Sequence, residues 1–207
     1  MHALHAFFTI KSDMPVNIPI ILTWLRVALI PLMVGVLYLP DAWLGPFNKT
    51  QGLASTIIFI VAALTDWVDG FLARRWNQTS AFGAFLDPVA DKLMVTGALL
   101  VLIEFGRVNA VIAIIIIGRE ITISALREWM AQIGASKSVA VSSLGKIKTA
   151  AQMIAIPMLL YYQDVWGIDT ELWGERLLFV AAVLTVWSMF YYLRKAWPLI
   201  KESGGHH

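Results

Sequence analysis

The chain of 207 residues is 58% hydrophobic, only 14% charged and free of cysteine, with a net charge of +2. Soluble domains are about 45–50% apolar, so this composition favours a membrane protein. The absence of cysteine excludes disulfides and thiolate metal sites, and the low charge content leaves too few basic residues for a nucleic-acid partner.

The two ends of the chain are set apart from its apolar body. Residues 1–13 lack the basic segment and cleavage site of a signal peptide. We expect them to be an N-terminal extension, with Met14 as the natural start, or a short interfacial segment. Residues 14–203 contain no polar linker long enough to divide them and are predicted to form one domain. Residues 204–207 are interpreted as the remnant of a purification tag.

Apolar stretches of about 20 residues recur along the chain, and this is the length that an α-helix needs to cross a membrane. They predict an all-α, polytopic membrane protein built as a bundle of six transmembrane helices. The helices are expected at residues 17–39, 51–76, 86–105, 109–131, 144–163 and 173–196. Gly106 and Asn109 mark the break between the third and fourth helices, and Pro88 falls near the start of the third, where proline is tolerated.

Basic residues are distributed unequally between the two sides of this predicted bundle. Of the 16 lysines and arginines, only three fall on one side: Lys49, Arg107 and Arg176. Because basic residues are enriched in cytoplasmic segments, both termini and the opposite helix ends are predicted to be cytoplasmic.

Four aspartates interrupt the apolar sequence near the cytoplasmic ends of the second and third helices: Asp66, Asp69, Asp87 and Asp91. A carboxylate at the centre of a membrane costs roughly 2.5–3.5 kcal/mol, so four of them must be compensated. Hard oxygen donors suit Mg²⁺, Mn²⁺ or Ca²⁺. Two metal ions would balance four negative charges and clamp phosphoryl oxygens, which predicts a substrate with a phosphoanhydride or phosphodiester.

Small residues lie beside the predicted metal site. The helix face that carries the first two aspartates continues with Gly70 and Ala73 and leaves a slot there. Arg74 borders the slot, and its planar guanidinium can contact an anionic oxygen. On the third helix, Gly83 shares a face with the other two aspartates and permits close approach of a ligand.

A second cluster is mainly basic and lies on the fourth helix and just beyond it. Its members are Arg119, Glu120, Arg127, Lys137, Lys146 and Lys148. A basic pocket beside a metal site suits a second, phosphorylated substrate. We predict that the phosphate of this acceptor is bound by Arg119, Arg127, Lys137 and Lys146.

Other interpretations of these residues remain open. The aspartates could form a proton relay or an ion pathway, as in a divalent-cation transporter. Arg119 and Arg127 could pair with Glu120 and Glu128 or reach lipid phosphates. Trp67 lies between the first two aspartates and is a further residue to test.

The chain resembles the CDP-alcohol phosphotransferases in the spacing of their signature residues: Asp66, Asp69, Gly70, Ala73, Arg74, Gly83, Asp87 and Asp91. The likeness runs from about Met14 to about Leu193, nearly the whole chain, and includes residues 17–26, 119–129 and 145–153. It implies a six-helix bundle, usually a homodimer, in the bacterial inner membrane, with the site open to the cytoplasmic leaflet.

The resemblance also implies roles for single residues. Asp66, Asp69 and Asp87 would hold two Mg²⁺ or Mn²⁺ ions, and Asp91 would complete the metal site and act as general base. The residues implied in nucleotide binding are Asn17, Thr23, Asp69, Gly70, Ala73, Arg74 and Gly83.

The implied activity is transfer of a phosphatidyl group from CDP-diacylglycerol to glycerol 3-phosphate, which yields phosphatidylglycerol phosphate and CMP. The basic cluster argues for a phosphorylated acceptor, but only the likeness of the longer segments selects glycerol 3-phosphate. Inositol phosphate and phosphatidylglycerol therefore stay open as alternative acceptors.

Overall fold

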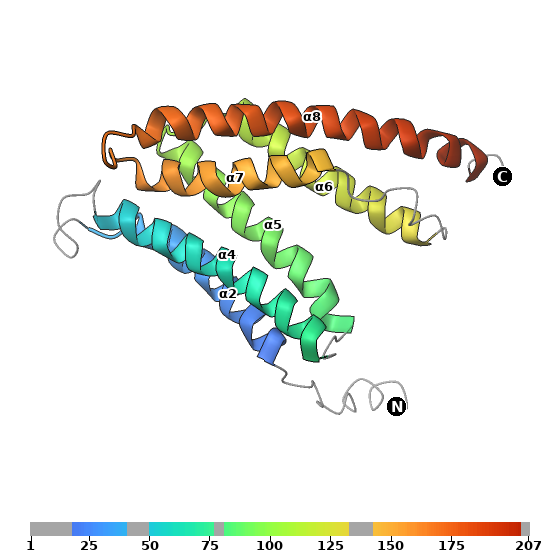
Figure 1. Cartoon of the computed structure of the whole chain (residues 1–207), viewed down its shortest axis with the longest axis horizontal. Coiled ribbons are helices and arrows are strands. Elements are labelled where there is room, and N and C mark those ends of the chain that lie inside the picture. The colour runs from blue at the N-terminus through green and yellow to red at the C-terminus, as the bar shows by residue number, and fades with distance from the viewer. Residues whose placement is uncertain (1–17, 41–49, 77–80, 133–142, 204–207) are drawn as a thin grey trace, which may run out of the picture.

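A computed structural model describes residues 18–40, 50–76, 81–132 and 143–203 (Figure 1). These ranges contain no β-strand and six α-helices: α2 (Ile18–Val36), α4 (Thr50–Trp76), α5 (Ala81–Glu104), α6 (Ala110–Gln132), α7 (Ser143–Tyr161) and α8 (Thr170–Ser203). The predicted all-α fold with six helices is confirmed. The extension 1–13 and the tail 204–207 lie outside the described residues.

Two predicted helix boundaries are wrong. α5 begins at Ala81 and not at residue 86, so Pro88 lies inside the helix. A proline removes one backbone hydrogen bond, but it need not end a helix whose flanking turns are supported. α8 continues to Ser203 instead of ending at residue 196. Polarity ends a membrane span but not a helix, because lysine and arginine are good helix formers.

The turn between α5 and α6 forms where the sequence predicts it. Gly106 adopts a left-handed φ of 69°, which glycine reaches without steric cost. The backbone N–H of Arg107 donates to the carbonyl of Leu102 (2.8 Å) and so closes α5. Asn109 Oδ1 accepts a hydrogen bond from the N–H of Val111 (2.8 Å) and caps the start of α6.

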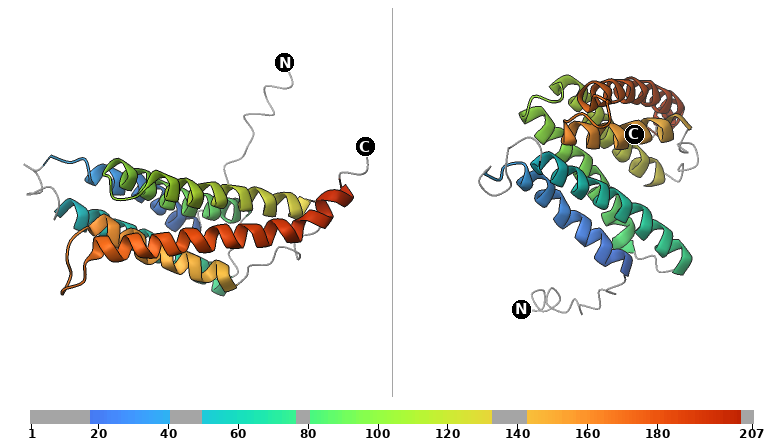
Figure 2. Two further views of the ribbon diagram at one scale, coloured as in Figure 1. Left: turned by 90° about the horizontal axis from the view of Figure 1, so that it is seen from above. Right: turned by 60° about the vertical axis from the view of Figure 1, so that its left-hand side comes forward.

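Successive helices run in opposite directions along the bundle (Figure 1). α2 packs along α4, α7 packs along α8, α5 contacts α2, and α6 contacts α8. At the end that holds the C-terminus, α2, α4 and α5 diverge from α6, α7 and α8 (Figure 1). The right-hand view in Figure 2 also shows the α2–α4 pair lying apart from α8. Asp66 lies on α4 and Asp87 and Asp91 lie on α5, whereas Arg119 and Arg127 lie on α6 and Lys148 lies on α7.

The apolar core lies where the helices meet at the other end. Phe59 on α4, Met94 on α5 and Ile156 on α7 are all buried in one cluster. α4 and α7 come close at Gly52, where a Cβ would lie 2.8 Å from the carbonyl oxygen of Tyr161. Glycine permits this approach, so the two helices can pack backbone against backbone.

The surface of the bundle suits a lipid environment. Among the described residues, two stretches are long and apolar enough to cross a membrane: Thr50–Val68 in α4 and Thr170–Arg194 in α8. Shorter apolar stretches lie in α2 and α7, at Ile21–Val36 and Ile147–Tyr161. Large apolar side chains also face outward, among them Ile114, Trp187 and Phe190. An apolar surface of this kind is unfavourable in water and favourable in a membrane.

Candidate active site

The first aspartate of the predicted metal site is paired with an arginine from another helix. Asp66 lies on α4, and its Oδ1 is 2.5 Å from Nη1 of Arg26 on α2. The Arg26 side chain is completely buried, whereas Asp66 is 43% exposed. A guanidinium so close to a carboxylate stabilises its negative charge in apolar surroundings. Arg26 is absent from the predicted site, although an arginine within an apolar helix itself indicates a buried acidic partner.

Thr23 lies one turn before Arg26 on α2 and contacts another of the aspartates. Its Oγ1 donates a hydrogen bond to Oδ1 of Asp87 on α5 (2.7 Å). The sequence predicts Thr23 as a nucleotide contact, and its position beside a predicted metal ligand is compatible with that role. One face of α2 therefore orients carboxylates that α4 and α5 supply.

Asp91 lies one turn beyond Asp87 on α5 and links the aspartates to the basic cluster. Its charged neighbours include Asp66, Arg26 and Glu120. Its Oδ1 is buried and accepts no hydrogen bond from the described residues. Because a buried carboxylate oxygen without a partner is costly, this atom is suited to meet a ligand, a metal ion or a proton.

A cavity of about 180 Å³, here called the polar pocket, joins Asp91 to the basic cluster. The residues that line it come from α5, α6, α7 and α8: Asp91, Arg119, Glu120, Ile123, Arg127, Lys148, Thr149 and Tyr192. A smaller cavity of about 40 Å³ shares Asp91 and Glu120 with it and also contacts Lys92 and Gln152. Three predicted site residues, Asp91, Arg119 and Arg127, therefore line the same pocket. Lys148, which is not among the predicted phosphate ligands, lines it as well.

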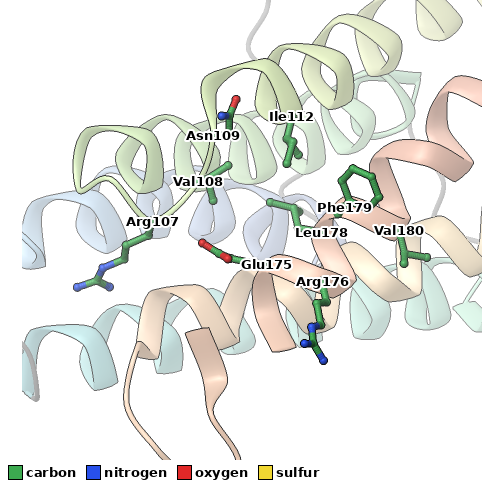
Figure 3. Close-up of a pocket in the computed structure, with 9 residues that line it drawn as sticks. All are labelled: Arg107, Val108, Asn109, Ile112, Glu175, Arg176, Leu178, Phe179 and Val180. Carbon is green, nitrogen blue, oxygen red and sulfur yellow. The ribbon is translucent and has the colours of Figure 1, made fainter. Parts of the chain in front are cut away.

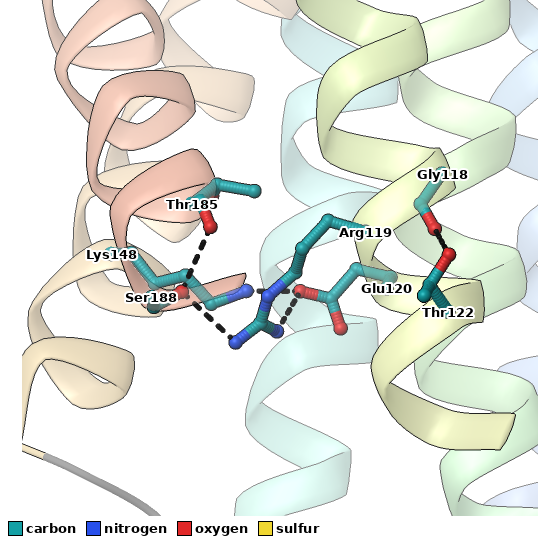
Figure 4. A network of polar contacts seen from close by, with 7 residues as sticks. All are labelled: Gly118, Arg119, Glu120, Thr122, Lys148, Thr185 and Ser188. Carbon is teal, nitrogen blue, oxygen red and sulfur yellow. Dashed lines mark hydrogen bonds and ion pairs between the residues drawn. The ribbon is translucent and has the colours of Figure 1, made fainter. Parts of the chain in front are cut away.

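Figure 4 shows the network that holds Arg119 in the polar pocket. Arg119 Nη1 donates to Oε1 of Glu120 (3.1 Å), and Nη2 donates to Oγ of Ser188 on α8 (3.2 Å). Lys148 on α7 donates to the same Glu120 oxygen, and Ser188 donates to the carbonyl of Thr185 (2.9 Å). Glu120 therefore bridges two cations from different helices. Ser188 and Thr185 are not predicted, because single hydroxyls in a membrane helix usually serve packing.

Part of the predicted site lies beyond what the structure describes. Asn17 and Lys137 belong to segments outside the described ranges. For other predicted residues only the helical backbone is described: Asp69, Gly70, Ala73, Arg74 and Lys146. Gly83 lies in the first turn of α5, one turn before Asp87. Trp67 is 69% exposed on α4.

The described aspartates have the chemistry that hard divalent cations require. Asp66, Asp87 and Asp91 offer carboxylate oxygens, and the buried, unpartnered Oδ1 of Asp91 is an atom that a metal ion would satisfy. Among the described residues, no three acidic, histidine or cysteine side chains lie close enough to hold an ion by themselves.

A larger cavity of about 540 Å³, here called the outer cavity, lies beside the start of α6 (Figure 3). Its polar lining residues are Arg107, Asn109, Glu175 and Arg176. Arg107 and Arg176 are two of the three basic residues that the sequence predicts on the outer side, and here they line one cavity. The other residues that line the outer cavity are apolar, and its single acid, Glu175, is exposed. These lining residues therefore include no buried acid of the kind that Asp91 supplies to the polar pocket.

A helical bundle that brings aspartates and a basic pocket to one end is the arrangement expected of a membrane enzyme that transfers phosphate-containing groups. The sequence model of the family described as CDP-alcohol phosphatidyltransferase matches residues 16–187. The chain belongs to the CDP-alcohol phosphatidyltransferase family.

Individual relatives agree with this assignment. A protein of Salmonella choleraesuis (strain SC-B67) is 53% identical over 185 residues, which cover 88% of this chain and 96% of the relative. Proteins of Escherichia coli (strain K12) and Shigella flexneri serotype 5b (strain 8401) are 54% identical with the same coverage. All three carry the name CDP-diacylglycerol–glycerol-3-phosphate 3-phosphatidyltransferase.

Proposed function

We propose that this chain transfers the phosphatidyl group of CDP-diacylglycerol to glycerol 3-phosphate, releasing CMP and leaving phosphatidylglycerol phosphate in the membrane. The observation that carries the proposal is the polar pocket, which Asp91 lines together with three cationic side chains, those of Arg119, Arg127 and Lys148. The names of the similar bacterial proteins supply the two substrates.

The polar pocket suits a small acceptor that carries both a phosphate and a hydroxyl group. Arg119, Arg127 and Lys148 would bind the phosphate through charge-assisted hydrogen bonds. Lys137 and Lys146, of which Lys146 lies in α7, would add to this positive surface. Sites for drug-sized ligands are about 300–1,000 Å³. A pocket of about 180 Å³ therefore favours glycerol 3-phosphate over a second lipid such as phosphatidylglycerol.

The donor is proposed to bind at the ends of α2, α4 and α5. The cytidine diphosphate would lie in a slot lined by Asn17, Thr23, Asp69, Gly70, Ala73, Arg74 and Gly83. Two Mg²⁺ or Mn²⁺ ions held by Asp66, Asp69, Asp87 and Asp91 would neutralise the diphosphate and make CMP a better leaving group. Arg26, which pairs with Asp66, and Thr23, which donates to Asp87, would keep these carboxylates oriented.

The protein's own part in the reaction is positioning and one proton transfer. The acceptor hydroxyl oxygen bonds to the phosphorus nearer the diacylglycerol, and the bond from that phosphorus to CMP breaks with its electron pair leaving on CMP. The hydroxyl proton passes to the carboxylate of Asp91, which lines the polar pocket. Arg119 and Lys148 hold the acceptor phosphate, so that the attack occurs within one complex.

We further propose that all six helices cross the bacterial inner membrane, with both termini and the polar pocket on the cytoplasmic side. The excess of basic residues at the other helix ends supports this orientation, since only three of the 16 lysines and arginines, Lys49, Arg107 and Arg176, fall on the outer side. The chain has no cysteine, so single introduced cysteines can be labelled from one side of sealed vesicles to test it. A homodimer is also proposed, and light scattering in detergent would measure the mass of the assembly.

The test of the proposed function is CMP release by purified protein in detergent, given CDP-diacylglycerol and Mg²⁺, with and without glycerol 3-phosphate. We expect release that requires glycerol 3-phosphate, stops when EDTA removes the metal and returns with Mg²⁺ or Mn²⁺. Release with inositol phosphate or phosphatidylglycerol alone would overturn the acceptor. No release with any alcohol by folded protein would overturn the proposal, and metal flux into liposomes would then indicate a transporter.

A further inference from the structure

Besides Asp91, a second acidic side chain lines the polar pocket and contacts two of its three cations. Glu120, on α6, accepts hydrogen bonds from both Arg119 and Lys148 with one carboxylate oxygen. These two cations are among the most buried charged groups of the described chain, at 6% and 2% exposed. A carboxylate at this place repels a phosphate, so its presence needs a physical reason.

The reason lies in the two cations themselves. Arg119 comes from α6 and Lys148 from α7, and burial leaves little water between them to screen their charges. Two like charges close together at low dielectric repel strongly. Glu120 lies between them and offsets this repulsion, while Ser188 on α8 accepts from the second terminal nitrogen of Arg119 (3.2 Å). The guanidinium is therefore held at two edges before any ligand arrives (Figure 4).

We propose that Glu120 and Ser188 are positioning residues for the acceptor. They hold Arg119 and Lys148 in the arrangement that receives one phosphate group, and they act through these cations without binding the substrate. The identity of the acceptor rests on the proposed function, whereas the anion site does not. Without Glu120 the two cations repel each other and turn apart, so the site loses its preorganisation for phosphate.

The positioning role of Glu120 and its simple charge repulsion of phosphate predict opposite effects of neutralising this residue. Coulomb's law alone predicts that an anion pocket binds phosphate more tightly once its carboxylate is neutralised. Positioning predicts weaker binding after the same change. The sign of the effect of Glu120→Gln on acceptor binding therefore separates the two explanations.

The experiment compares Glu120→Gln and Ser188→Ala with matched changes outside the pocket. Glu128→Gln neutralises an exposed acid two turns further along α6, and Thr122→Val removes an exposed hydroxyl that donates to the Gly118 carbonyl of its own helix (2.7 Å). Glu120→Gln should raise KM for glycerol 3-phosphate about tenfold or more and change KM for CDP-diacylglycerol less than about twofold. Ser188→Ala should raise the acceptor KM about threefold. Both controls should behave as the wild type.

A second readout measures binding without turnover. Calorimetry with glycerol 3-phosphate, and separately with inorganic phosphate, is carried out in the absence of donor. Weaker binding to Glu120→Gln and Ser188→Ala, with Glu128→Gln unchanged, supports the proposal. Equal or tighter binding to Glu120→Gln overturns it, as does a wild type that binds neither anion.

The same measurements separate this proposal from the proposed function. If the wild type releases no CMP but the two variants still bind phosphate more weakly, the transfer reaction fails and the positioning role stands. Thermal unfolding checks that each variant is folded. If Glu120→Gln does not fold, the test uses Glu120→Asp and Ser188→Ala. Unchanged phosphate binding in both of these variants would overturn the proposal.

Discussion

Two buried arginines of this chain, Arg107 and Arg119, have different surroundings at the two cavities. Both are 6% exposed. Arg107 donates from Nη1 to the backbone carbonyls of Leu159 and Leu160 (3.1 and 2.8 Å), and its guanidinium carbon lies 4.4 Å from the centre of the Tyr162 ring. Arg119 instead donates to side chains, and its cavity holds further charged groups: Asp91, Arg127 and Lys148.

The difference shows that burial alone does not distinguish an arginine that bonds to the backbone from one that lines a polar pocket. The last carbonyls of a helix lack partners within the helix, and Arg107 satisfies two of them at the end of α7. Its charge therefore stabilises the fold. The partners of Arg119 are the side chains of Glu120 and Ser188, beside a cavity that holds further charged groups. The nature of the partner, backbone or side chain, separates these two arginines.

The largest expected effect concerns the acids of the two cavities. Asp91→Asn should lower the rate of CMP release about 100- to 10,000-fold, because an asparagine amide cannot take the proton of the acceptor hydroxyl. Glu175→Gln, at the outer cavity, should leave the rate unchanged. The measurement is CMP release under saturating substrates. An equal loss of rate in Glu175→Gln would mean that the outer cavity also takes part in the reaction, and would contradict the different roles of the two cavities.

The next effect uses one substitution at both arginines. Arg119→Lys keeps the charge but loses the planar fork that contacts Glu120 and Ser188 together. Losing a charge-assisted hydrogen bond of about 1.5–3 kcal/mol corresponds to a rise of about 10- to 100-fold in KM for glycerol 3-phosphate. Arg107→Lys should leave this KM unchanged. Steady-state kinetics over a range of glycerol 3-phosphate concentrations measures KM for both variants. Equal changes in KM would contradict the different roles assigned to Arg119 and Arg107.

The structural role of Arg107 predicts a loss of stability. Arg107→Met leaves the carbonyls of Leu159 and Leu160 without their donor, which should cost about 1–3 kcal/mol in the free energy of unfolding. Arg176→Met is the matched change at an exposed arginine of the same cavity, and it should cost less. Unfolding in detergent micelles, followed by circular dichroism, measures the difference. A stable Arg107→Met variant with impaired turnover would reverse the assignment.

The smallest effect is a pH dependence at the same end of the molecule. A hydrogen bond with Glu171, with burial as the second cause, raises the pKa of Tyr162 from 10.0 to about 12. Because the folded pKa exceeds the unfolded one, the neutral phenol stabilises the folded state fully below pH 10.0, and this contribution is lost as the pH rises through about 12. Tyr162→Phe should lose less stability than the wild type over that range. Melting temperatures measured against pH, with Tyr161→Phe as control, test this.

Several parts of the site could be predicted because they depend on local spacing. The intervals between Asp66, Asp69, Asp87 and Asp91 place carboxylates on defined helix faces whatever the helices pack against. Arg119 and Arg127 are separated by about two helical turns, so a common pocket was a reasonable expectation, and both line the polar pocket with Asp91. Their roles toward metal and acceptor stay predictions.

Other parts could not be predicted, because they depend on which helices become neighbours. Arg26 meets Asp66 across α2 and α4, and Lys148 meets Glu120 across α6 and α7. Ser188 reaches Arg119 only because α8 lies beside α6. Nothing in the local sequence of Ser188 distinguishes it from a hydroxyl that serves packing.

The order of residues was enough to predict six helices and a membrane setting, because hydrophobic periodicity and the cost of burying charge act within short segments. Of the predicted acids and bases, Asp91, Arg119 and Arg127 line one pocket. Packing decided which cations meet which acids, and it made Arg107 a structural residue and Arg119 part of a pocket. Those outcomes depend on contacts between residues far apart in the chain, and such contacts exist only once the helices are assembled.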